Sequence, residues 1–481
     1  MKKLFTLLIC SIVLNFNVVA NEMIKLELRG FFMGNRLKIA ATANKQFTID
    51  WGDDSSIETI TGTGSSQILH HSYAENDNWS NYYEVIIASN SADCFFILFD
   101  CSWNDVTTLD VSASISLERL NCSQNKLINL DVDANTALTE LICDGNSLST
   151  LDVDKFAVLT RLSFNNNHLK NINVSANPLL TCLSFELNQI NSLDVSANPL
   201  LTSLDCYGNE LSNLDIRANT LLEALYCGRN QLTDLDVSKN TKLNALSCRD
   251  NKLTDLDVSE NTKLNSLSCG GNKLTDLDLT NNKKVVTLWC SHNQLLLSKL
   301  YEISQIVYPE YDTDLLLGSQ TLDPQAIEVG GVIDFSSQAA FGGIATIFTI
   351  EKGDSPAVID IDYSINGGVI TFIRNGIYKV IMTNQVLPSF SYFPTQVIAE
   401  FIVGTVGMTD VTQTNGLIYP NPTNGMIYIK TEKEIIPEVK LYSTDGKLLQ
   451  HVRNVEIDMS NYATGVYVIQ VDGKNMRLIK F

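Results

Sequence analysis

Residues that could carry catalysis are few and scattered in this chain of 481 residues. Its histidines are His70, His71, His168, His292 and His451. The sequence contains no H-E-x-x-H zinc motif, no G-x-S-x-G nucleophile turn and no glycine-rich phosphate loop ahead of a helix. His70 and His71 are adjacent, the other three lie far apart in the sequence, and we interpret each as an ordinary surface residue. We therefore expect a protein that is not an enzyme and has no catalytic residues.

Cysteines could form disulfides or bind zinc, and the chain has eleven. Most of them share one position in a 21-residue spacing: Cys101, Cys122, Cys143, Cys206, Cys227, Cys248, Cys269 and Cys290. Phe164 and Phe185 take the same position in two intervening copies, so the position requires apolar volume rather than sulfur. Cys10, Cys94 and Cys182 lie off the spacing, and no C-x-x-C motif occurs. These cysteines are predicted to be buried small hydrophobes, with no metal site.

Aspartates also recur with the same period, at Asp110, Asp131, Asp152, Asp194, Asp215, Asp236, Asp257 and Asp278, with Asn173 in one copy. Calcium would require several oxygens converging on each ion. The alternative is that each carboxylate caps the turn that follows it. We favour capping and expect no cofactor, and a calcium-dependent melting temperature would favour the metal.

The elements that position these residues are set by the repeat itself. Each copy has the pattern L-x-x-L-x-[LC]-x-x-N-x-L, and its asparagine column is unbroken: Asn104, Asn125, Asn146, Asn167, Asn188, Asn209, Asn230, Asn251, Asn272 and Asn293. This spacing resembles that of leucine-rich-repeat proteins. The resemblance implies a mainly β solenoid over residues 96–296, with about ten repeats, a parallel sheet of short strands, and turns or 3₁₀ segments opposite. Residues 297–316 are predicted to form a C-terminal cap or linker.

The first 20 residues resemble a secretory signal peptide. Lys2 and Lys3 precede an apolar stretch, and Val18-Val19-Ala20 is a small-residue cleavage site. We found no later apolar run long enough to span a membrane. The net charge of −20 argues against nucleic acid as a partner.

Two further β modules are expected beside the solenoid. Residues 21–95 contain the string Trp51-Gly52-Asp53-Asp54 and the later triplet His71-Ser72-Tyr73, which resemble the W-G-D-G turn and H-x-Y strand entry of PKD-type β-sandwiches. Asp50, Asp53 and Asp54 could bind calcium, but we interpret them as turn-capping carboxylates. Residues 317–404 alternate apolar and polar residues between glycine turns, which favours an immunoglobulin-like sandwich.

The C-terminal segment, residues 414–481, is similar to the type A sorting domain of the bacterial type IX secretion system. The residues that carry this resemblance are Tyr419, Pro420, Asn421, Pro422, Gly425, Asp445, Gly446, Gly465, Tyr467 and Lys480. The resemblance implies export to the outer surface of a Gram-negative bacterium by the type IX machinery. Attachment to surface lipopolysaccharide or release would follow.

The remaining question is where a partner binds. Outward positions of the predicted strands can be read from the repeat, because they alternate with the inward leucine and cysteine. The most distinctive outward residues are Asp205, Tyr207, Tyr226, Arg229, Arg249 and Trp289. Tyrosine, tryptophan and arginine are common anchors at binding surfaces. We predict a secreted surface protein for binding and adhesion, which recognises a protein or glycan on host or neighbouring cells through a concave face. A structural spacer or stalk is the alternative, and an accessory to a secreted hydrolase is a weaker one.

Overall fold

The computed structural model describes residues 22–31, 34–73, 81–307, 314–389 and 394–404. In the C-terminal region it describes 418–419, 426–429, 438–443, 447–453, 456–462, 465–471 and 474–480. The predicted signal peptide lies outside these residues. The chain divides into two compact units, one of Met1–Thr321 with Gln385–Thr395 and one of Leu322–Asn384 with Gln396–Phe481. Within the described residues, no helix is long and apolar enough to cross a membrane.

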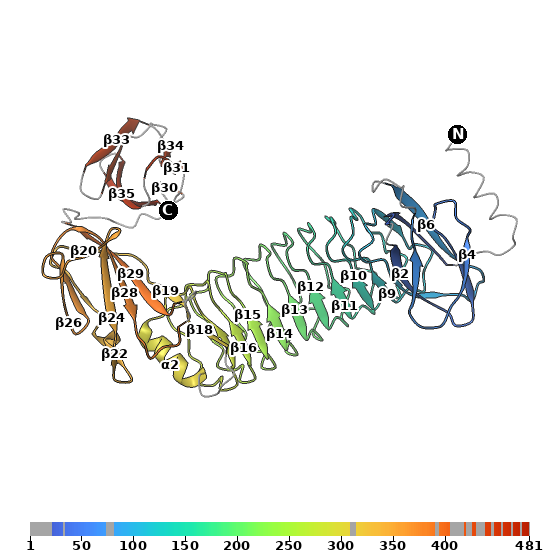
Figure 1. Cartoon of the computed structure of the whole chain (residues 1–481), viewed down its shortest axis with the longest axis horizontal. Coiled ribbons are helices and arrows are strands. Elements are labelled where there is room, and N and C mark those ends of the chain that lie inside the picture. The colour runs from blue at the N-terminus through green and yellow to red at the C-terminus, as the bar shows by residue number, and fades with distance from the viewer. Residues whose placement is uncertain are drawn as a thin grey trace. The chain divides into compact units, whose positions relative to one another are not determined.

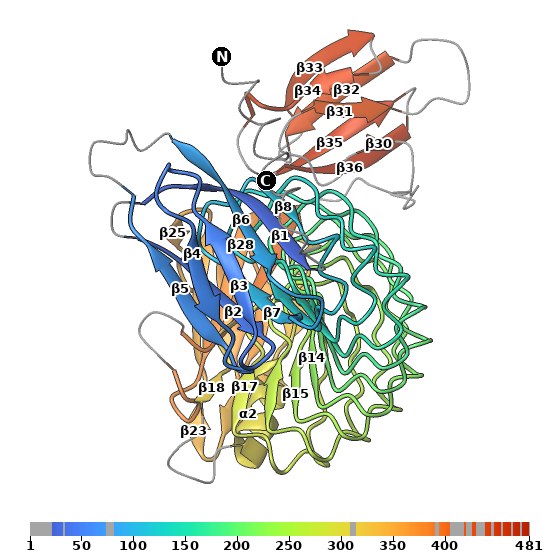
Figure 2. The same cartoon turned by 90° about the vertical axis from the view of Figure 1, so that its right-hand side faces the viewer.

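The predicted solenoid is confirmed, and residues 119–289 form its regular part (Figures 1 and 2). Each turn contributes one three-residue strand: β9 (Arg119–Asn121), β10 (Glu140–Ile142), β11 (Arg161–Ser163), β12 (Cys182–Ser184), β13 (Ser203–Asp205), β14 (Ala224–Tyr226), β15 (Ala245–Ser247), β16 (Ser266–Ser268) and β17 (Thr287–Trp289). Neighbouring strands pair in parallel with their equivalent residues in register, as Leu204 with Leu225. The leucine and cysteine columns point inward and are fully buried, as Leu225 and Cys227 show. One apolar core therefore runs through all the turns.

The asparagine column holds successive turns together. The Nδ2 group of Asn209 donates to the carbonyl oxygens of Phe185, Cys206 and Tyr207 at 3.0, 3.2 and 3.3 Å. Its Oδ1 accepts the backbone N–H of Ile190, 3.0 Å away. Each buried amide thus satisfies backbone groups of two turns where the chain leaves the strand.

A second asparagine column, which we did not single out in the sequence, lies on the other side of each turn. Its members are Asn135, Asn177, Asn198, Asn219, Asn240, Asn261 and Asn282, and all are fully buried. The Nδ2 group of Asn240 donates to the carbonyl oxygens of Ile216 and Asn219, at 3.0 and 2.9 Å. The chain therefore fastens each turn to its neighbour at two separate corners.

The N-terminal strands pack as two sheets, and one of these sheets continues into the solenoid. The strands are β1 (Met23–Arg29), β2 (Asn35–Ala41), β3 (Gln46–Asp50), β4 (Glu58–Thr61), β5 (Gln67–His71), β6 (Tyr82–Ser89), β7 (Phe96–Asp100) and β8 (Thr108–Asp110). One sheet has the order β4-β3-β6-β1-β8, and the other runs β5-β2-β7-β9 into the repeats. Phe47 of β3 meets Phe96 of β7 edge to face, with ring centroids 5.7 Å apart, so the core lies between the sheets.

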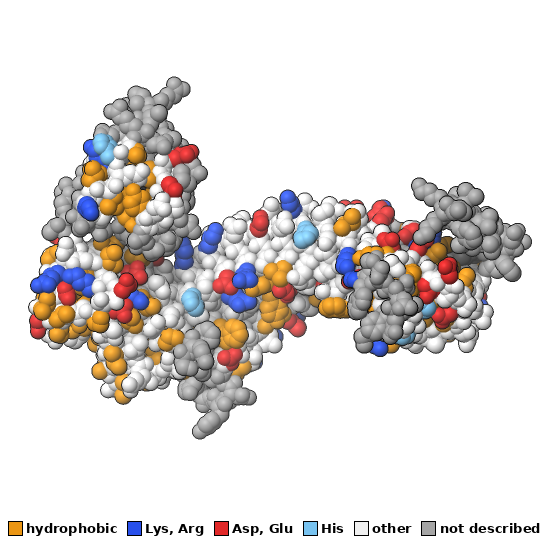
Figure 3. Space-filling view, turned by 45° about the horizontal axis from the view of Figure 1, so that its top comes forward, with side chains coloured by type: hydrophobic (Ala, Val, Ile, Leu, Met, Phe, Trp, Pro, Cys, Tyr) orange, Lys and Arg blue, Asp and Glu red, His pale blue; other side chains and the backbone are white. Residues whose placement is uncertain are grey.

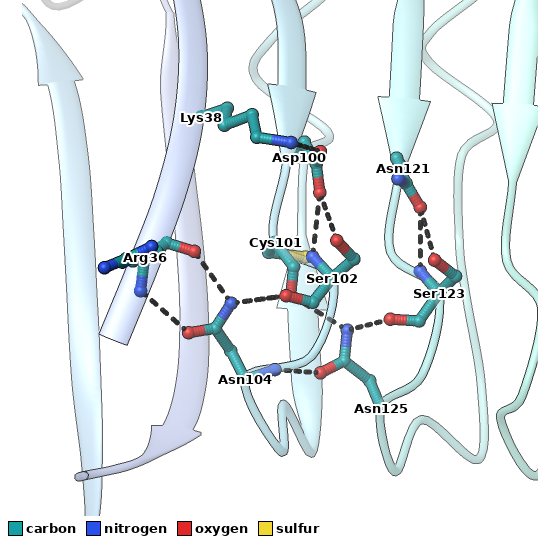
Figure 4. Close-up of polar contacts among 9 residues, drawn as sticks. All are labelled: Arg36, Lys38, Asp100, Cys101, Ser102, Asn104, Asn121, Ser123 and Asn125. Carbon is teal, nitrogen blue, oxygen red and sulfur yellow. Dashed lines mark hydrogen bonds and ion pairs between the residues drawn. The ribbon is translucent and has the colours of Figure 1, made fainter. Parts of the chain in front are cut away.

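The junction between this module and the solenoid extends the asparagine ladder (Figure 4). Asn104 donates to the carbonyl oxygen of Arg36 in β2 at 2.9 Å and accepts the N–H of Arg36 at 3.2 Å. Its own N–H donates to Oδ1 of Asn125, 3.1 Å away. The backbone of β2 thus forms the hydrogen bonds with Asn104 that a preceding repeat would form. The N-terminal module therefore closes this end of the solenoid.

The opposite end is closed by the helix α2 (Leu297–Val307) and the strands β18 (Asp314–Leu316) and β19 (Ser319–Thr321). The sequence predicted a cap here but not its helix, whose inner face includes Leu300 and Ile303. β18 adds to the sheet in parallel with β17. Gln320 takes the place of the next asparagine, because its Oε1 accepts the N–H of Asn293 at 3.1 Å.

The strands after the solenoid form two facing sheets. Their bounds are β20 (Gln325–Glu328), β21 (Val332–Asp334), β22 (Ala340–Phe341), β23 (Ile344–Ala345), β24 (Ile347–Lys352), β25 (Ser355–Pro356), β26 (Tyr363–Asn366), β27 (Val369–Phe372), β28 (Gly376–Thr383) and β29 (Gln396–Gly404), with a 3₁₀ turn η2 at Ser336–Gln338. One sheet contains β29-β28-β24-β25 with β20 beside β29, and the other is β21-β27-β26. Phe372 and Phe401 pack between them, with centroids 5.4 Å apart.

The C-terminal strands are β30 (Ile418–Tyr419), β31 (Met426–Ile429), β32 (Glu438–Ser443), β33 (Leu448–Arg453), β34 (Glu456–Asp458), β35 (Gly465–Val471) and β36 (Lys474–Lys480). They form a sheet of order β30-β31-β34 and another of order β33-β32-β35-β36. A small core of buried residues includes Val439, Leu441, Tyr467 and Ile469. Strands β32 and β33 pair in an antiparallel arrangement.

Candidate binding face

The outward side chains of the parallel strands line one exposed sheet face. Five of the six predicted binding residues lie on consecutive turns and form one group, the Tyr–Arg cluster: Asp205, Tyr207, Tyr226, Arg229 and Arg249. Figure 3 shows basic and hydrophobic side chains side by side near the middle of the solenoid.

Tyr207 is the centre of the Tyr–Arg cluster. Its hydroxyl oxygen accepts a hydrogen bond from Nη2 of Arg249 at 2.8 Å, two turns away. Cζ of Arg249 lies 5.0 Å from the centroid of the Tyr207 ring, and Cζ of Arg229 lies 6.0 Å from it. Two guanidinium groups thus share one aromatic ring, within the range of cation–π attraction. Neither arginine forms an ion pair with a described carboxylate, so both charges are available to a ligand.

Gly228 makes room for this arrangement. A Cβ atom at residue 228 would lie 3.0 Å from Cγ of Arg249 and 3.1 Å from Cδ2 of Tyr207. The arginine and the tyrosine therefore meet over a glycine that separates their turns. The sequence signal for the cluster is this small residue between two long side chains, all at outward positions.

Asp205 lies on β13 directly beside Tyr226 of β14 in the sheet register. Its Oδ1 accepts the backbone N–H of Tyr207 at 3.1 Å. Burial raises the pKa of the Asp205 carboxyl, and the charge of Glu186 adds to the rise, against the opposing effect of the Tyr207 N–H. The cluster thus combines two unpaired cations with one partly buried carboxyl group.

Trp289 lies apart from the Tyr–Arg cluster, three strands beyond Tyr226. Its indole Nε1 donates to Oδ2 of Asp314 at 3.0 Å, which fixes the orientation of the ring. Tyr226 is 39% exposed and Trp289 is 40% exposed, so each keeps a large part of its surface available. The alternation of the strands predicted both rings to point outward, as the structure shows.

The aspartate column caps turns, as the sequence favoured. Oδ1 of Asp236 accepts the backbone N–H of Ser238 at 3.0 Å, and the same contact recurs at Asp257 and Asp278. These hydrogen bonds lower the pKa of each carboxyl. No group of three or more His, Cys, Asp or Glu side chains is arranged for a metal within the described part of the chain.

The cysteine column lines the core with free thiols. Burial raises the pKa of the thiols of Cys122, Cys248 and Cys290 to about 12, so they are protonated and unreactive at neutral pH. Phe164 and Phe185, which replace cysteine in two turns, stack with centroids 5.6 Å apart. Cys182 differs, because it lies at an outward position and is half-buried.

The N-terminal turn is also held by its own carboxylates. Oδ1 of Asp50 accepts the N–H of Gly52, and Asp53 accepts the N–H of Ser55. Nε2 of His71 lies 2.7 Å from Oδ2 of Asp53, and its ring stacks on Trp51 with centroids 4.9 Å apart. These contacts give His71 and the aspartates a structural role in the turn.

The predicted sorting residues are only partly covered by the structure. Pro420, Asn421, Pro422, Gly425, Asp445 and Gly446 lie outside the described residues. Tyr419 ends β30, and Gly465 of β35 pairs with Lys480 of β36. Tyr467 is buried in the small core and contacts the ring of Tyr462, with centroids 5.8 Å apart.

Solved structures of leucine-rich-repeat proteins resemble the chain. A leucine-rich-repeat protein of Leptospira interrogans has 23% identity and a TM-score of 0.41, over 46% of this chain and 59% of that one. InlJ of Listeria monocytogenes, whose functional domain includes a cysteine ladder, has 20% identity and a TM-score of 0.26, over 66% and 93%. The effector YopM of Yersinia pestis has 21% identity and a TM-score of 0.34, over 41% and 55%. The chain thus spans less than two thirds of the Leptospira and Yersinia chains.

No curated protein matches the sequence of this chain. One family model does match its C-terminal segment: residues 417–481 correspond to the secretion system C-terminal sorting domain. The match begins just before β30 and includes β31 to β36, so it coincides with the C-terminal strands described above. The tail is therefore a type IX sorting domain, which implies that the protein is secreted.

Proposed function

We propose that this chain is a secreted protein that binds a protein or glycan through the exposed sheet face of its solenoid, with the Tyr–Arg cluster as the anchor. The sorting tail supports delivery to the outer surface of a Gram-negative bacterium, where the protein is attached to lipopolysaccharide or released. The N-terminal and post-solenoid strands would serve as PKD-like and immunoglobulin-like modules that present the solenoid.

The observation that carries the proposal is the pairing of Tyr207 with Arg249 and Arg229. Two exposed guanidinium groups over one tyrosine ring give the solenoid core no additional packing. Arginine and tyrosine are, however, the residue types that contribute most to binding at interfaces. Their position on consecutive turns gives a partner one continuous contact area.

A triple variant tests the proposal. Replacing Tyr207, Tyr226 and Arg249 with alanine in the full chain should weaken binding at least about tenfold, a loss of about 1.4 kcal/mol. Because all three side chains lie outside the core, the melting temperature should change little. The screen would use a glycan array and a pull-down from neighbouring cells.

The matched control replaces three exposed apolar residues away from the Tyr–Arg cluster, Ile115, Ile128 and Val158, with alanine. This control should bind as the unmodified chain does. Equal binding by the cluster variant and the control would contradict the proposal.

A further inference from the structure

The repeats that follow the Tyr–Arg cluster carry a second distinctive surface, the lysine column: Lys242, Lys263 and Lys284. These residues occupy the same position in three consecutive turns, immediately before the first inward residue of each. With Asn244, Asn265 and Glu223 they line a shallow hollow of about 370 Å³. All three lysines are exposed, and they lie beside the start of each strand.

The lysines of the column are not held in ion pairs by any described side chain, although Glu223 lines the same hollow. None of the three forms an ion pair with a carboxylate among the described residues, whereas Lys299 pairs with both Asp276 and Glu302. Like charges on adjacent turns about 4.8 Å apart repel one another. The three charges therefore remain available to a ligand, in a chain whose net charge is −20.

The column is also specific to these turns. In earlier repeats the same position holds exposed apolar side chains, Val158, Leu179 and Leu200. The solenoid core therefore does not require lysine there. The change to lysine coincides with the strands β15 to β17, where Tyr226 and Trp289 border the sheet face.

The sheet face beside the lysine column has an aromatic residue at each end. Its outward floor consists of small residues on β15 and β16: Ala245, Ser247, Ser266 and Ser268. Tyr226 and Trp289 stand on β14 and β17, three strand spacings or about 14 Å apart. Aromatic faces stack on sugar rings, and small residues between two such rings leave room for a chain of sugars that crosses the strands.

We infer that the ligand of this face is an acidic polysaccharide that runs across β14 to β17, with its sugar rings on Tyr226 and Trp289 and its carboxylates on the lysine column. This inference rests on the proposed function and names its ligand class. Each turn offers one ammonium group, so a polymer with one carboxylate per sugar matches the column charge for charge. Arg229 and Arg249 extend the positive surface along the opposite strand edge.

Other polymers fit the surface less well. A protein partner usually requires pockets for apolar anchors, and the floor of alanine and serine provides none. Nucleic acid shares the negative charge of an acidic polysaccharide, so the experiment below includes it as a competing ligand.

The experiment uses the full chain and polygalacturonate, a polymer with one carboxylate on every sugar. Its fully methyl-esterified form has the same backbone without charge and serves as the matched ligand. Calorimetric titration should show binding to polygalacturonate that weakens as salt is added, and at least tenfold weaker binding to the ester.

The decisive variant replaces Lys242, Lys263 and Lys284 with glutamine, which removes three charges but retains side-chain length. Its affinity for polygalacturonate should fall at least tenfold with an unchanged melting temperature. The control replaces three exposed lysines outside the column, Lys25, Lys170 and Lys239, with glutamine. It should bind polygalacturonate as the unmodified chain does. Unchanged affinity in the column variant would overturn the inference.

Three further outcomes separate the inference from the proposed function. Asp205→Asn removes a negative charge from the Tyr–Arg cluster, so tighter binding of polygalacturonate would show that the anionic polymer also contacts the cluster. Weaker binding would count against the inference. Equally tight binding of single-stranded DNA would indicate a general polyanion surface and overturn the glycan assignment. If only a neutral glycan or a protein binds, and the Tyr207, Tyr226 and Arg249 variant loses that binding, the inference fails while the proposed function stands.

Discussion

Arg229 occupies a backbone position that would suit glycine better, and this permits a test that separates stability from binding. The residue has a φ of 50°, in the left-handed region. The equivalent corner of every repeat is left-handed, and three of these corners are Gly145, Gly208 and Gly271. A residue with a Cβ costs roughly 1–2 kcal/mol in this conformation. The arginine at this corner therefore lowers the stability of the fold relative to glycine.

The expected effect of Arg229→Gly can be worked from these contacts. The backbone N–H of residue 229 donates to the carbonyl oxygen of Arg249 at 2.8 Å, and glycine keeps this bond. Relief of the left-handed strain is offset in part by the greater freedom of glycine in the unfolded chain, roughly 0.5–1 kcal/mol. The free energy of unfolding should therefore rise by about 0.5–1 kcal/mol. Binding should weaken, because one of the two guanidinium groups over Tyr207 is lost.

Calorimetric melting and titration with polygalacturonate would measure the two effects on the full chain. Gln124→Gly is the matched control, since Gln124 has a φ of 55° at the same corner five turns earlier. It should stabilise the chain similarly and leave binding unchanged. A less stable Arg229→Gly variant would refute the strain argument, and stabilisation with undiminished binding would refute a role for Arg229 in the binding face.

The remaining expectations concern the core, the turns and export. Asn209→Ala should lower the free energy of unfolding by roughly 1–3 kcal/mol in denaturant titration, because the buried N–H of Ile190 loses its acceptor. Cys227→Ser should also destabilise through an unsatisfied hydroxyl, whereas Cys227→Val should cost little; equal effects would contradict the inward placement of this column. The pKa values of Asp215, Asp236 and Asp278 are lowered, that of Asp215 to about 2, so their contribution to stability is present above about pH 4 and lost as the pH falls toward 2. A melting temperature that stays constant from pH 5 to pH 2 would contradict a stabilising role for these turn-capping carboxylates. Deletion of Leu417–Phe481 should leave the protein in the periplasm, and normal surface display of the truncated chain would refute the role of the sorting tail.

The sequence was most informative where one residue type is repeated for one physical reason. The inward leucine and cysteine columns and the first asparagine column were readable because each position has the same neighbours in every turn. The second asparagine column is equally regular, at Asn240 and Asn261 for example, but its amides lie in a segment for which the spacing predicts only turns. The helix α2 was missed because it occurs once, after the repeat has ended.

The candidate binding face could be predicted only in part, because a sequence column shows which way a side chain points but not which residues it contacts. The outward placement of Tyr207 and Arg249 followed from the alternation of the strand, but their hydrogen bond depends on the space above Gly228. The lysine column has the same 21-residue spacing, but the sequence did not distinguish it. Exposed lysines are common, and a sequence does not show whether each one forms an ion pair with a carboxylate. Two structural observations support a ligand at the lysine column. Lys263 forms no ion pair within the described residues, and Trp289 lies at the end of the sheet face of small residues beside the column. Charge that a solenoid leaves unpaired on consecutive turns is therefore better evidence for a ligand than the residue types alone.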